Sequence, residues 1–236
     1  MNHLLNEEQF PAGFLPAWFE ARRRHALEQA EQLPEPSRHM ESWRFGAPGN
    51  ESLEHVEAAP PAAPETLAPI IRERASMPEA LRIVYANGLP VSIPEELPEG
   101  LSVMDMEDFV LQCPDTARKY LETETETLGS EKLSALATAF QHNGLVIMAD
   151  REISLPLEIL HFISGDNVAV FPSTLLIAKT GSRLRILERH ISADHGRQFC
   201  GALQQYHLSS ASSVKYALVQ ELNSRSRAVE RSEEHT

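Results

Sequence analysis

The sequence predicts a mixed α and β protein in which helices and proline-rich chain precede a strand-rich C-terminal part. Short apolar runs of strand length follow one another over the last hundred or so residues, separated by short polar breaks. Long helical periods do not occur between the runs, which argues against crossover helices and a doubly wound sheet. Many short strands at roughly even spacing are typical of a sandwich, a barrel or a coiled β-solenoid. The runs are Leu145–Met148, Leu157–Ile163, Val168–Phe171, Leu175–Ala178, Leu184–Leu187, Gln205–Leu208 and Val214–Leu222.

The chain before these strands begins with a predicted helix over residues 16–33, which carry a partial apolar stripe. Pro34 ends this helix, because proline cannot continue a helical hydrogen-bond pattern. Eleven of the 16 prolines fall within residues 34–98, which are therefore predicted to be linker-like. Inside this stretch Leu81–Ala86 is a predicted strand that closes in the turn Asn87–Gly88.

Two further helices are predicted between residue 106 and residue 143. Apolar side chains recur at i, i+3, i+4 and i+7 from Met106, and again from Leu133 to Phe140. Asn143 and Gly144 are a typical helix stop for the second of these helices. Cys113 lies on the apolar face of the first and is predicted to be a core thiol.

The net charge of −13 is concentrated in residues 51–131, which carry 17 acidic and 5 basic side chains. A nucleic-acid-binding protein would instead need a clustered basic face. The one tight basic cluster, Arg22–Arg24, lies on the first predicted helix, and we interpret it as a solvated face. No nucleic-acid partner is therefore expected. The tract 122–127, in which Glu and Thr alternate, is expected to form a mobile acidic loop.

Membrane association is not expected either, because no apolar run is long enough to cross a bilayer. The first eight residues lack a basic segment followed by an apolar one, so no signal peptide is predicted. Two cysteines, Cys113 and Cys200, lie in dissimilar contexts. A disulfide framework is therefore not expected, and a reducing, cytoplasmic location is predicted.

Candidate chemistry is sparse. His190, His195 and Cys200 are evenly spaced and could be combined with Asp194 into a metal site. Zinc sites usually contain closer pairs such as C-x2-C or H-x3-H, so the spacing favours surface and loop residues over metal ligands. His161 alternates with apolar neighbours and is predicted to be packed in or beside a sheet. No nucleophile-elbow, Walker A, dinucleotide-binding or HExxH motif is present, and no enzymatic activity is predicted.

Five segments, taken in order, resemble signatures of the SufD proteins of iron–sulfur cluster assembly. They are residues 36–45, 87–101, 136–144, 155–159 and 219–221, which resemble R-x-x-E-x-W-[KR]-[YF]-T, NG…LPxGV, LNxAFxxDG, xPIxI and VQ(N/E). Each motif is weak alone, but their order and spacing together cover nearly the whole chain. The positions that carry the resemblance are Glu41, Trp43, Arg44, Phe45, Asn87, Gly88, Phe140, Gly144, Pro156 and Gln220.

The resemblance implies an N-terminal helical and proline-rich acidic region, residues 1–131, followed by a right-handed parallel β-helix. Residues 132–230 would be the first coils of that β-helix, which would be incomplete. The implied function is that of a non-enzymatic subunit of a SufBCD-type scaffold complex, with a SufB-like subunit and a SufC-like ATPase as partners. No cofactor is implied for residues 1–236, since an iron–sulfur cluster and a flavin would belong to the assembled complex. The partner-contact positions would lie beyond the end of the chain.

Two neighbouring interpretations stay open beside this one. A SufB-like paralogue would share the strand-rich core, but the segment from Glu41 to Arg44 favours SufD. A polysaccharide-acting β-helix enzyme would need several carboxylates on one face, whereas the acidic residues of 132–230 are scattered. Trp43 is expected to be a structural anchor rather than a partner-binding residue.

The last residues, 231–236, resemble the translation of a common sequencing adapter, and we expect them to be a non-native tail; the alternative is a natural polar terminus. The strand-like pattern continues as far as Gln220, so we also expect the chain to be a fragment of a longer protein. A cut across a solenoid exposes unpaired strand edges, which would make the isolated chain poorly soluble or oligomeric.

Overall fold

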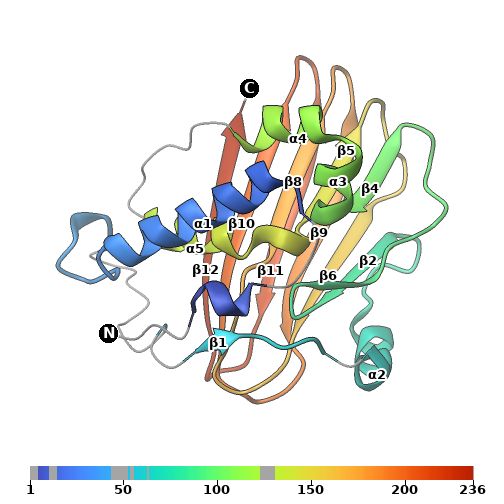
Figure 1. Ribbon diagram of the computed structural model, residues 1–236. Coiled ribbons are helices and arrows are strands. Elements are labelled where there is room, and N and C mark those ends of the chain that lie inside the picture. Colours follow the sequence, from blue (N-terminus) through green and yellow to red (C-terminus); the bar gives the residue numbers. More distant parts are fainter. Residues whose placement is uncertain are drawn as a thin grey trace.

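The computed structural model describes residues 5–10, 15–43, 53, 56–62, 64–122 and 131–235. Within these residues the protein combines five α-helices with two β-sheets, and its C-terminal region is a parallel β-solenoid of about 3 turns (Figure 1). The predicted mixed α and β architecture is confirmed. Of the three strand arrangements that the sequence leaves open, the solenoid is the correct one.

The helices are α1 (Ala17–Gln32), α2 (Pro64–Arg74), α3 (Met106–Gln112), α4 (Pro114–Leu121) and α5 (Glu131–Ala139). The strands are β1 (Glu57–Ala58), β2 (Leu81–Ala86), β3 (Leu89–Ser92), β4 (Leu101–Asp105), β5 (Leu145–Ala149), β6 (Leu157–Ile163), β7 (Val168–Val170), β8 (Ser173–Ala178), β9 (Arg183–Ser192), β10 (Gln198–Leu208), β11 (Ser213–Glu221) and β12 (Arg227–His235). Short 3-10 turns lie at Glu7–Gln9, Glu41–Trp43 and Gln141–Asn143.

From β5 onward the chain alternates between the two sheets and so winds into the solenoid. Sheet A has the order β1-β7-β10-β8-β5-β4, with β12 paired to β10, and sheet B has the order β11-β9-β6-β2-β3. Among the strands from β5 onward, parallel neighbours are about 30 residues apart in the chain, as in the pairing of Arg183 with Ser213, which is a typical repeat length for a solenoid. The pairing is antiparallel at one edge of each sheet. There β4 pairs with β5 in sheet A, and β3 pairs with β2 in sheet B.

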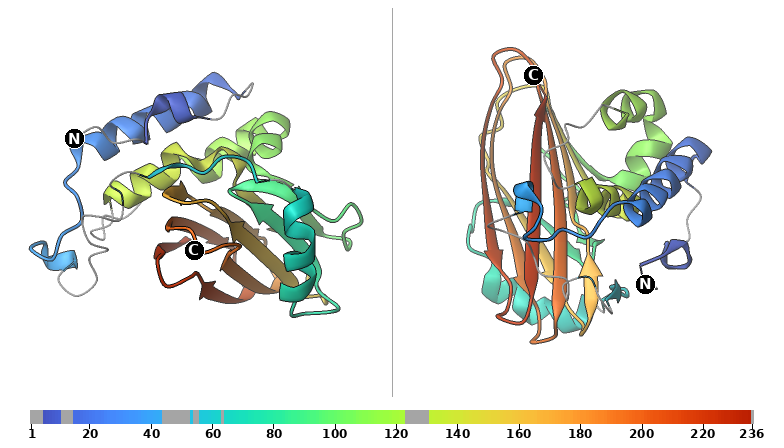
Figure 2. Two further views of the ribbon diagram at one scale, coloured as in Figure 1. Left: turned by 90° about the horizontal axis from the view of Figure 1, so that it is seen from below. Right: turned by 90° about the vertical axis from the view of Figure 1, so that its left-hand side faces the viewer.

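Helices cover the outer faces of both sheets (Figures 1 and 2). α1, α3, α4 and α5 lie over sheet A and cover apolar side chains such as Leu175, Phe199 and Leu203. α2 lies over the outer face of sheet B, against Leu160 and Phe162. Another apolar cluster fills the space between the sheets. Its side chains belong to β2, β4, β5, β6, β8 and β9. The solenoid interior therefore lies between two sheets, and helices cover the outer face of each.

Strand β6 shows how its sequence produces this arrangement. Every residue of Leu157–Ile163 is buried, because α2 covers one face of the strand and the solenoid interior covers the other. Successive side chains alternate between the faces. Ile159 and His161 consequently point inward, whereas Leu160 and Phe162 point toward α2. An uninterrupted apolar run is the pattern expected of such a parallel strand that is buried on both faces.

The predicted elements correspond closely to the observed ones. Each predicted C-terminal run lies in or overlaps a strand, and the run Leu157–Ile163 has the same bounds as β6. The predicted strand Leu81–Ala86 likewise has the same bounds as β2, and the three predicted helices correspond to α1, α3 and α5. Cys113 is partly buried against the cluster around α3, in agreement with its predicted core position.

Helices α2 and α4 are not predicted by the sequence pattern, and both begin at a proline. A proline is compatible with the first position of a helix, where its missing N–H would have no intrahelical partner. Pro64 begins α2 and Pro114 begins α4, and Pro69 lies inside α2. The proline-rich stretch 34–98 is therefore not linker-like throughout, because it contains a helix and three strands.

The interpretation of Arg22–Arg24 as a solvated face is wrong for two of the three arginines. Arg23 has no exposed surface, and its Nε donates a hydrogen bond of 2.9 Å to the carbonyl of Ala139. Its guanidinium also forms a 3.0 Å ion pair with Glu20. Arg22 donates to the side chain of Gln141, and Arg24 is exposed. The arginines join α1 to the end of α5, a role that a charge count along the sequence does not reveal.

The last residues continue strand β12 as far as His235, paired in parallel with β10. Leu203 is opposite Arg231, and His207 is opposite His235. The expectation that residues 231–236 are a non-native tail is not tested by this pairing and stays a prediction. Most of the tract 122–127 lies outside the described residues.

A charged network on the outer face of sheet B holds the end of α2. Glu158 has no exposed side-chain surface and accepts hydrogen bonds of 2.8 and 2.6 Å from the backbone and hydroxyl of Ser76, and 2.9 Å from Arg82. Arg189 lies 3.7 Å from Glu158 and 2.6 Å from Glu221. Burial alone would raise the pKa of the Glu158 carboxyl, but the hydrogen bonds from Ser76 and Arg82 lower its pKa below the usual value.

Replacing Glu158 with glutamine should destabilise the protein by about 1.5–3 kcal/mol at pH 7, because a hydrogen-bonded charge is removed from beside two arginines. The pKa of Glu158 is lower in the folded protein than its value of about 4.3 in the unfolded chain, so the ionised carboxylate stabilises the fold above about pH 4.3. This stability is lost as the pH falls through the folded-state pKa. The difference between the two proteins should therefore shrink on acidification. Urea unfolding at several pH values measures it.

The matched control is Glu152→Gln, because Glu152 is a largely exposed carboxylate 3.6 Å from the exposed Arg183. Exposed pairs of this kind contribute little, so the control should unfold like the unmodified chain. A difference between the Glu158 variant and the unmodified chain that grew below pH 4 would contradict the proposed role of the ionised carboxylate.

Candidate functional site

A group of polar side chains lies inside the solenoid, where apolar packing would otherwise be expected. We call it the interior polar cluster. Its members come from six strands that lie far apart in the sequence, and most of them are buried. They are His161, Thr174, Glu188, His190, Cys200, Gln204, Tyr216 and Glu230.

The strand register brings the cluster together. His161 in β6 pairs directly with His190 in β9, so both side chains share the inner face of sheet B. Glu188 lies two residues before His190 and therefore points to the same side. The centroids of the two imidazole rings are 5.2 Å apart, with the rings edge to face. Sheet A supplies Thr174 and further members from the opposite wall.

The Glu188 carboxylate is the centre of the cluster and has no exposed surface. One oxygen, Oε2, accepts a 3.1 Å hydrogen bond from the Thr174 hydroxyl and another from the Tyr216 hydroxyl. The other oxygen, Oε1, lies 2.9 Å from His190 Nε2 and 3.4 Å from His161 Nε2. Two hydroxyls thus fix one side of the carboxylate and leave the other side facing two imidazoles.

His190 is fully buried and is contacted at both ring nitrogens. Nε2 faces Glu188, whereas Nδ1 lies 3.3 Å from Glu230 Oε1 and 3.6 Å from the Cys200 sulfur. His161 is only 3% exposed, and neither of its ring nitrogens has a hydrogen-bond partner of good geometry among the described residues. Its ring lies 5.3 Å from that of Tyr85, centroid to centroid.

The proximity of these groups shifts their pKa values in opposite directions. Burial would raise the pKa of Glu188, but His161 and His190 beside it lower the pKa well below the usual range. Burial would lower the pKa of His190, but Cys200, Glu188 and Glu230 raise it well above the usual value. Burial lowers the pKa of His161 despite its contact with Glu188. Glu188 and His190 therefore each favour the charged form of the other, whereas burial favours the neutral form of His161.

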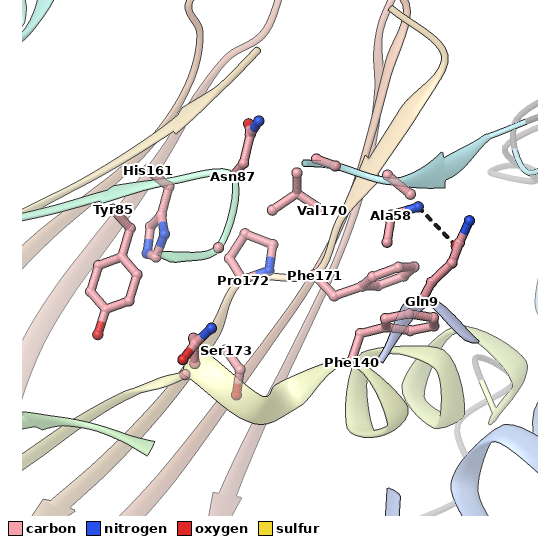
Figure 3. Close-up of a pocket in the computed structure, with 15 residues that line it drawn as sticks. Gln9, Ala58, Tyr85, Asn87, Phe140, His161, Val170, Phe171, Pro172 and Ser173 are labelled. Atoms are coloured by element: carbon pink, nitrogen blue, oxygen red, sulfur yellow. Dashed lines mark hydrogen bonds between the residues drawn. The ribbon is translucent and has the colours of Figure 1, made fainter. Parts of the chain in front are cut away.

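A small cavity of about 80 Å³ reaches the cluster at His161. Figure 3 shows His161 and Tyr85 on one side of the cavity and Phe140 and Phe171 on the other, with Pro172 between them. Pockets for drug-sized ligands occupy roughly 300–1,000 Å³. This cavity has room for a few water molecules or one ion, so a flavin does not fit in it, and no cysteine among the described residues lines it to hold an iron–sulfur cluster.

Four of the positions that carry the resemblance to SufD line this cavity: Asn87, Gly88, Phe140 and Gly144. Phe140 stacks on Phe171, with ring centroids 5.3 Å apart. A Cβ atom on Gly144 would lie 3.1 Å from the carbonyl oxygen of Ser173, so glycine lets β5 begin close to the β7–β8 corner. The structure therefore gathers motif positions that lie far apart in the sequence.

The other motif positions lie elsewhere. Pro156 precedes β6, and its carbonyl accepts a 2.9 Å hydrogen bond from Leu81. Gln220 is exposed on β11, opposite His190 in the parallel register. Glu41 is exposed, and Trp43 is partly buried against the cluster around α1 and α5. Arg44 and Phe45 lie outside the described residues.

Asn87 has a clear structural role at the cavity rim. Asn87 and Gly88 have φ angles of 48° and 78°, the left-handed values that a two-residue hairpin turn requires. The Asn87 side chain accepts a 2.9 Å hydrogen bond from the Ser164 backbone N–H and donates one of 2.7 Å to the Pro60 carbonyl. It therefore joins three segments of chain that are distant in the sequence.

The predicted surface and loop positions of His190 and Cys200 are wrong, since both side chains are fully buried. His195 is exposed in the loop after β9, in agreement with the surface and loop position that its spacing favours, and it does not join His190 and Cys200. Asp194 accepts hydrogen bonds from the Gly165 and Gly196 backbones and so holds loops rather than the cluster. The prediction that His161 is packed is confirmed.

Sequence reasoning missed Glu188, although its position in the strand contains a signal. Leu184 and Ile186 alternate inward along β9, and Glu188 and His190 continue the same period of two. A carboxylate followed by an imidazole on the buried face of a strand is unusual enough to indicate a polar site. The partner His161 lies about 30 residues earlier, one coil away.

Comparison with known proteins gives one distant relationship. The chain is 23% identical over 220 residues to the iron-sulfur cluster assembly protein SufD of Bacillus subtilis (strain 168). The match covers 89% of this chain and 50% of that protein, so the chain spans about half the length of the relative. No protein-family model matches the sequence. Among the described residues, no helix combines the length and the hydropathy that a membrane crossing requires.

Replacing Asn87 with alanine should destabilise the protein by about 2–4 kcal/mol, because the buried hydrogen bonds are lost and alanine disfavours a positive φ. Asn167→Ala is the control, since Asn167 is exposed but has a similar φ of 59°. It should cost about 1 kcal/mol, mostly from the backbone, because its side-chain hydrogen bonds with Asp166 and Arg197 are exposed and contribute little. Chemical denaturation measures both, and equal losses would contradict the proposed role of the side-chain hydrogen bonds.

Removing the Tyr216 hydroxyl by a Tyr216→Phe substitution should destabilise the protein by about 1.5–3 kcal/mol, since a donor to the buried Glu188 carboxylate is lost. Tyr85→Phe is the matched control in the same interior layer, because the Tyr85 hydroxyl is buried without a hydrogen-bond partner among the described residues. The control should be neutral or slightly stabilising. If the Tyr85 variant lost as much stability in thermal unfolding as the Tyr216 variant, the account of Glu188 would be wrong.

Proposed function

We propose that this chain is a SufD-like, non-enzymatic subunit of a scaffold complex for iron–sulfur cluster assembly. The observation that carries the proposal is the 220-residue match to a SufD protein, which extends over 89% of the chain. The five segments that resemble SufD signatures follow one another in the order of those signatures. Four of the positions that carry the resemblance line one cavity. A parallel solenoid under N-terminal helices is the architecture that the resemblance implies.

The edges of the solenoid support a scaffold role. At its first end, the antiparallel strands β3 and β4 flank the parallel strands of each sheet. At the other end, β11 pairs with β9 and β12 pairs with β10, and no further strand covers them among the described residues. Such an edge presents backbone N–H and C=O groups to another segment or subunit. We propose that a SufB-like subunit binds at a solenoid edge of this kind.

The distribution of carboxylates favours a scaffold over a polysaccharide-acting enzyme. On the outer face of sheet B, Glu158 and Glu221 are held in contacts with Arg82 and Arg189. Glycoside hydrolysis needs two carboxylates that are free to act as acid and as base or nucleophile on a substrate. Glu188, the buried carboxylate inside, lies in a space too small for a sugar chain. A SufB-like role is the nearest alternative, and a cytoplasmic location is part of the proposal.

Affinity purification of the epitope-tagged protein from its own cells tests the proposal. We expect a SufB-like subunit and a SufC-like ATPase to co-purify in amounts comparable to the tagged chain, because a scaffold subunit functions within its complex. A SufB-like identity would instead be indicated by recovery of a separate SufD-like partner. Recovery of the protein as a monomer that hydrolyses a polysaccharide would overturn the proposal.

A further inference from the structure

We propose that the interior polar cluster is a binding site for one divalent first-row transition-metal ion, with His161 Nε2, Glu188 Oε1 and His190 Nε2 as its protein ligands. The three side chains are buried on the inner face of sheet B, and their ligand atoms all lie within 4.8 Å of one another. The site goes beyond the proposed scaffold function and does not rest on it, because its geometry is independent of any partner protein.

The distances between the donor atoms suit a single ion. Glu188 Oε1 lies 2.9 Å from His190 Nε2 and 3.4 Å from His161 Nε2. For metal–ligand bonds of about 2.0–2.1 Å, two donors on one ion are roughly 2.9 Å apart in octahedral geometry and roughly 3.3 Å apart in tetrahedral geometry. Both observed distances fall near these values, so an ion can be coordinated with small side-chain adjustments.

The donor types select the class of metal. Two imidazoles and one carboxylate form the set that Fe²⁺, Co²⁺ and Zn²⁺ accept, whereas Mg²⁺ and Ca²⁺ prefer oxygen ligands alone. Three protein ligands leave at least one coordination position for water or another small ligand. The cavity of about 80 Å³ is lined by His161, so it supplies a route by which an ion and a water molecule can approach the site.

Neighbouring side chains orient the ligands in the way that metal sites require. The Thr174 and Tyr216 hydroxyls hold Glu188 Oε2, which leaves Oε1 directed at the two imidazoles. Glu230 lies 3.3 Å from His190 Nδ1, so a proton on Nδ1 is stabilised and the Nε2 lone pair is available to a metal. A carboxylate behind a ligating histidine is a recurrent arrangement at metal centres.

His161 provides an independent observation that points to a ligand. Its side chain is 3% exposed, yet neither ring nitrogen has a hydrogen-bond partner of good geometry among the described residues. Buried imidazole nitrogens are normally paired with a protein group or with water. An ion bound at Nε2 would satisfy this nitrogen.

Cobalt titration of the metal-stripped protein tests the site, because Co²⁺ gives visible absorption bands when protein nitrogen and oxygen atoms coordinate it. We expect one Co²⁺ per chain, with competition by Zn²⁺. Glu188→Gln and His190→Gln should weaken binding by about 100-fold or more, and Glu230→Gln by about 10–100-fold, because it acts through His190. His195→Gln is the matched control, since His195 is an exposed loop histidine near the same strand, and it should bind like the unmodified chain.

The absence of stoichiometric Co²⁺ binding, or an equal loss in the His195 and His190 variants, would overturn the proposal. Circular dichroism identifies any variant that fails to fold, and zinc X-ray absorption of the unmodified chain then decides the question without substitutions. Two imidazoles with only oxygen besides them would support the site, whereas a sulfur neighbour at about 2.3 Å would exclude this ligand set in favour of one that includes Cys200. A metal-free chain would leave the SufD-like proposal intact, and failed co-purification would leave the metal site intact.

Discussion

The parallel register of β6 on β9 is the constraint on which the rest of the structure depends. Because side chains alternate along a strand, pairing His161 with His190 also directs Glu188 inward and Leu160 and Arg189 outward. A shift of one residue would move the interior carboxylate to the face under α2 and bring the arginine into the solenoid. Apolar side chains on both faces of sheet B oppose that shift. Apolar packing thus fixes the position of the polar groups, and the polar contacts then refine it.

Sheet B buries one carboxylate on each face, and the two have different partners. Glu158 on the outer face is held by Arg82 and approached by Arg189, and because arginine keeps its charge at all accessible pH values this ion pair persists wherever Glu158 is ionised. Glu188 on the inner face is held by imidazoles, which can carry a proton or offer a lone pair. The outer contact can therefore only attach α2 to the sheet. The inner contact instead offers imidazole nitrogens to the metal ion proposed above.

Local patterns predict most of this fold, whereas contacts between coils are hidden from them. The strands and three helices are visible because hydrophobic period and turn residues are local properties, as at Asn87 and Gly88. The coil repeat is not visible, because equivalent inward positions hold different side chains, for example Ile159 opposite Glu188. The interior polar cluster is missed for the same reason, since its members become neighbours only after the coils stack. The motif positions around the cavity are found through resemblance, but nothing local predicts that they meet.

The cavity lies where the N-terminal region meets the solenoid, and this location connects the motif positions to the interior polar cluster. Gln9 and Ala58 contribute one part of its wall and are joined by a 3.1 Å hydrogen bond, while Asn87 contributes another. Loss of this contact between regions would open the cavity from the N-terminal side. His161 belongs to both the wall and the cluster, so whatever reaches the cluster from this side must pass the rim. The motif positions thus shape the access to a buried site, in addition to closing a turn and packing an aromatic ring.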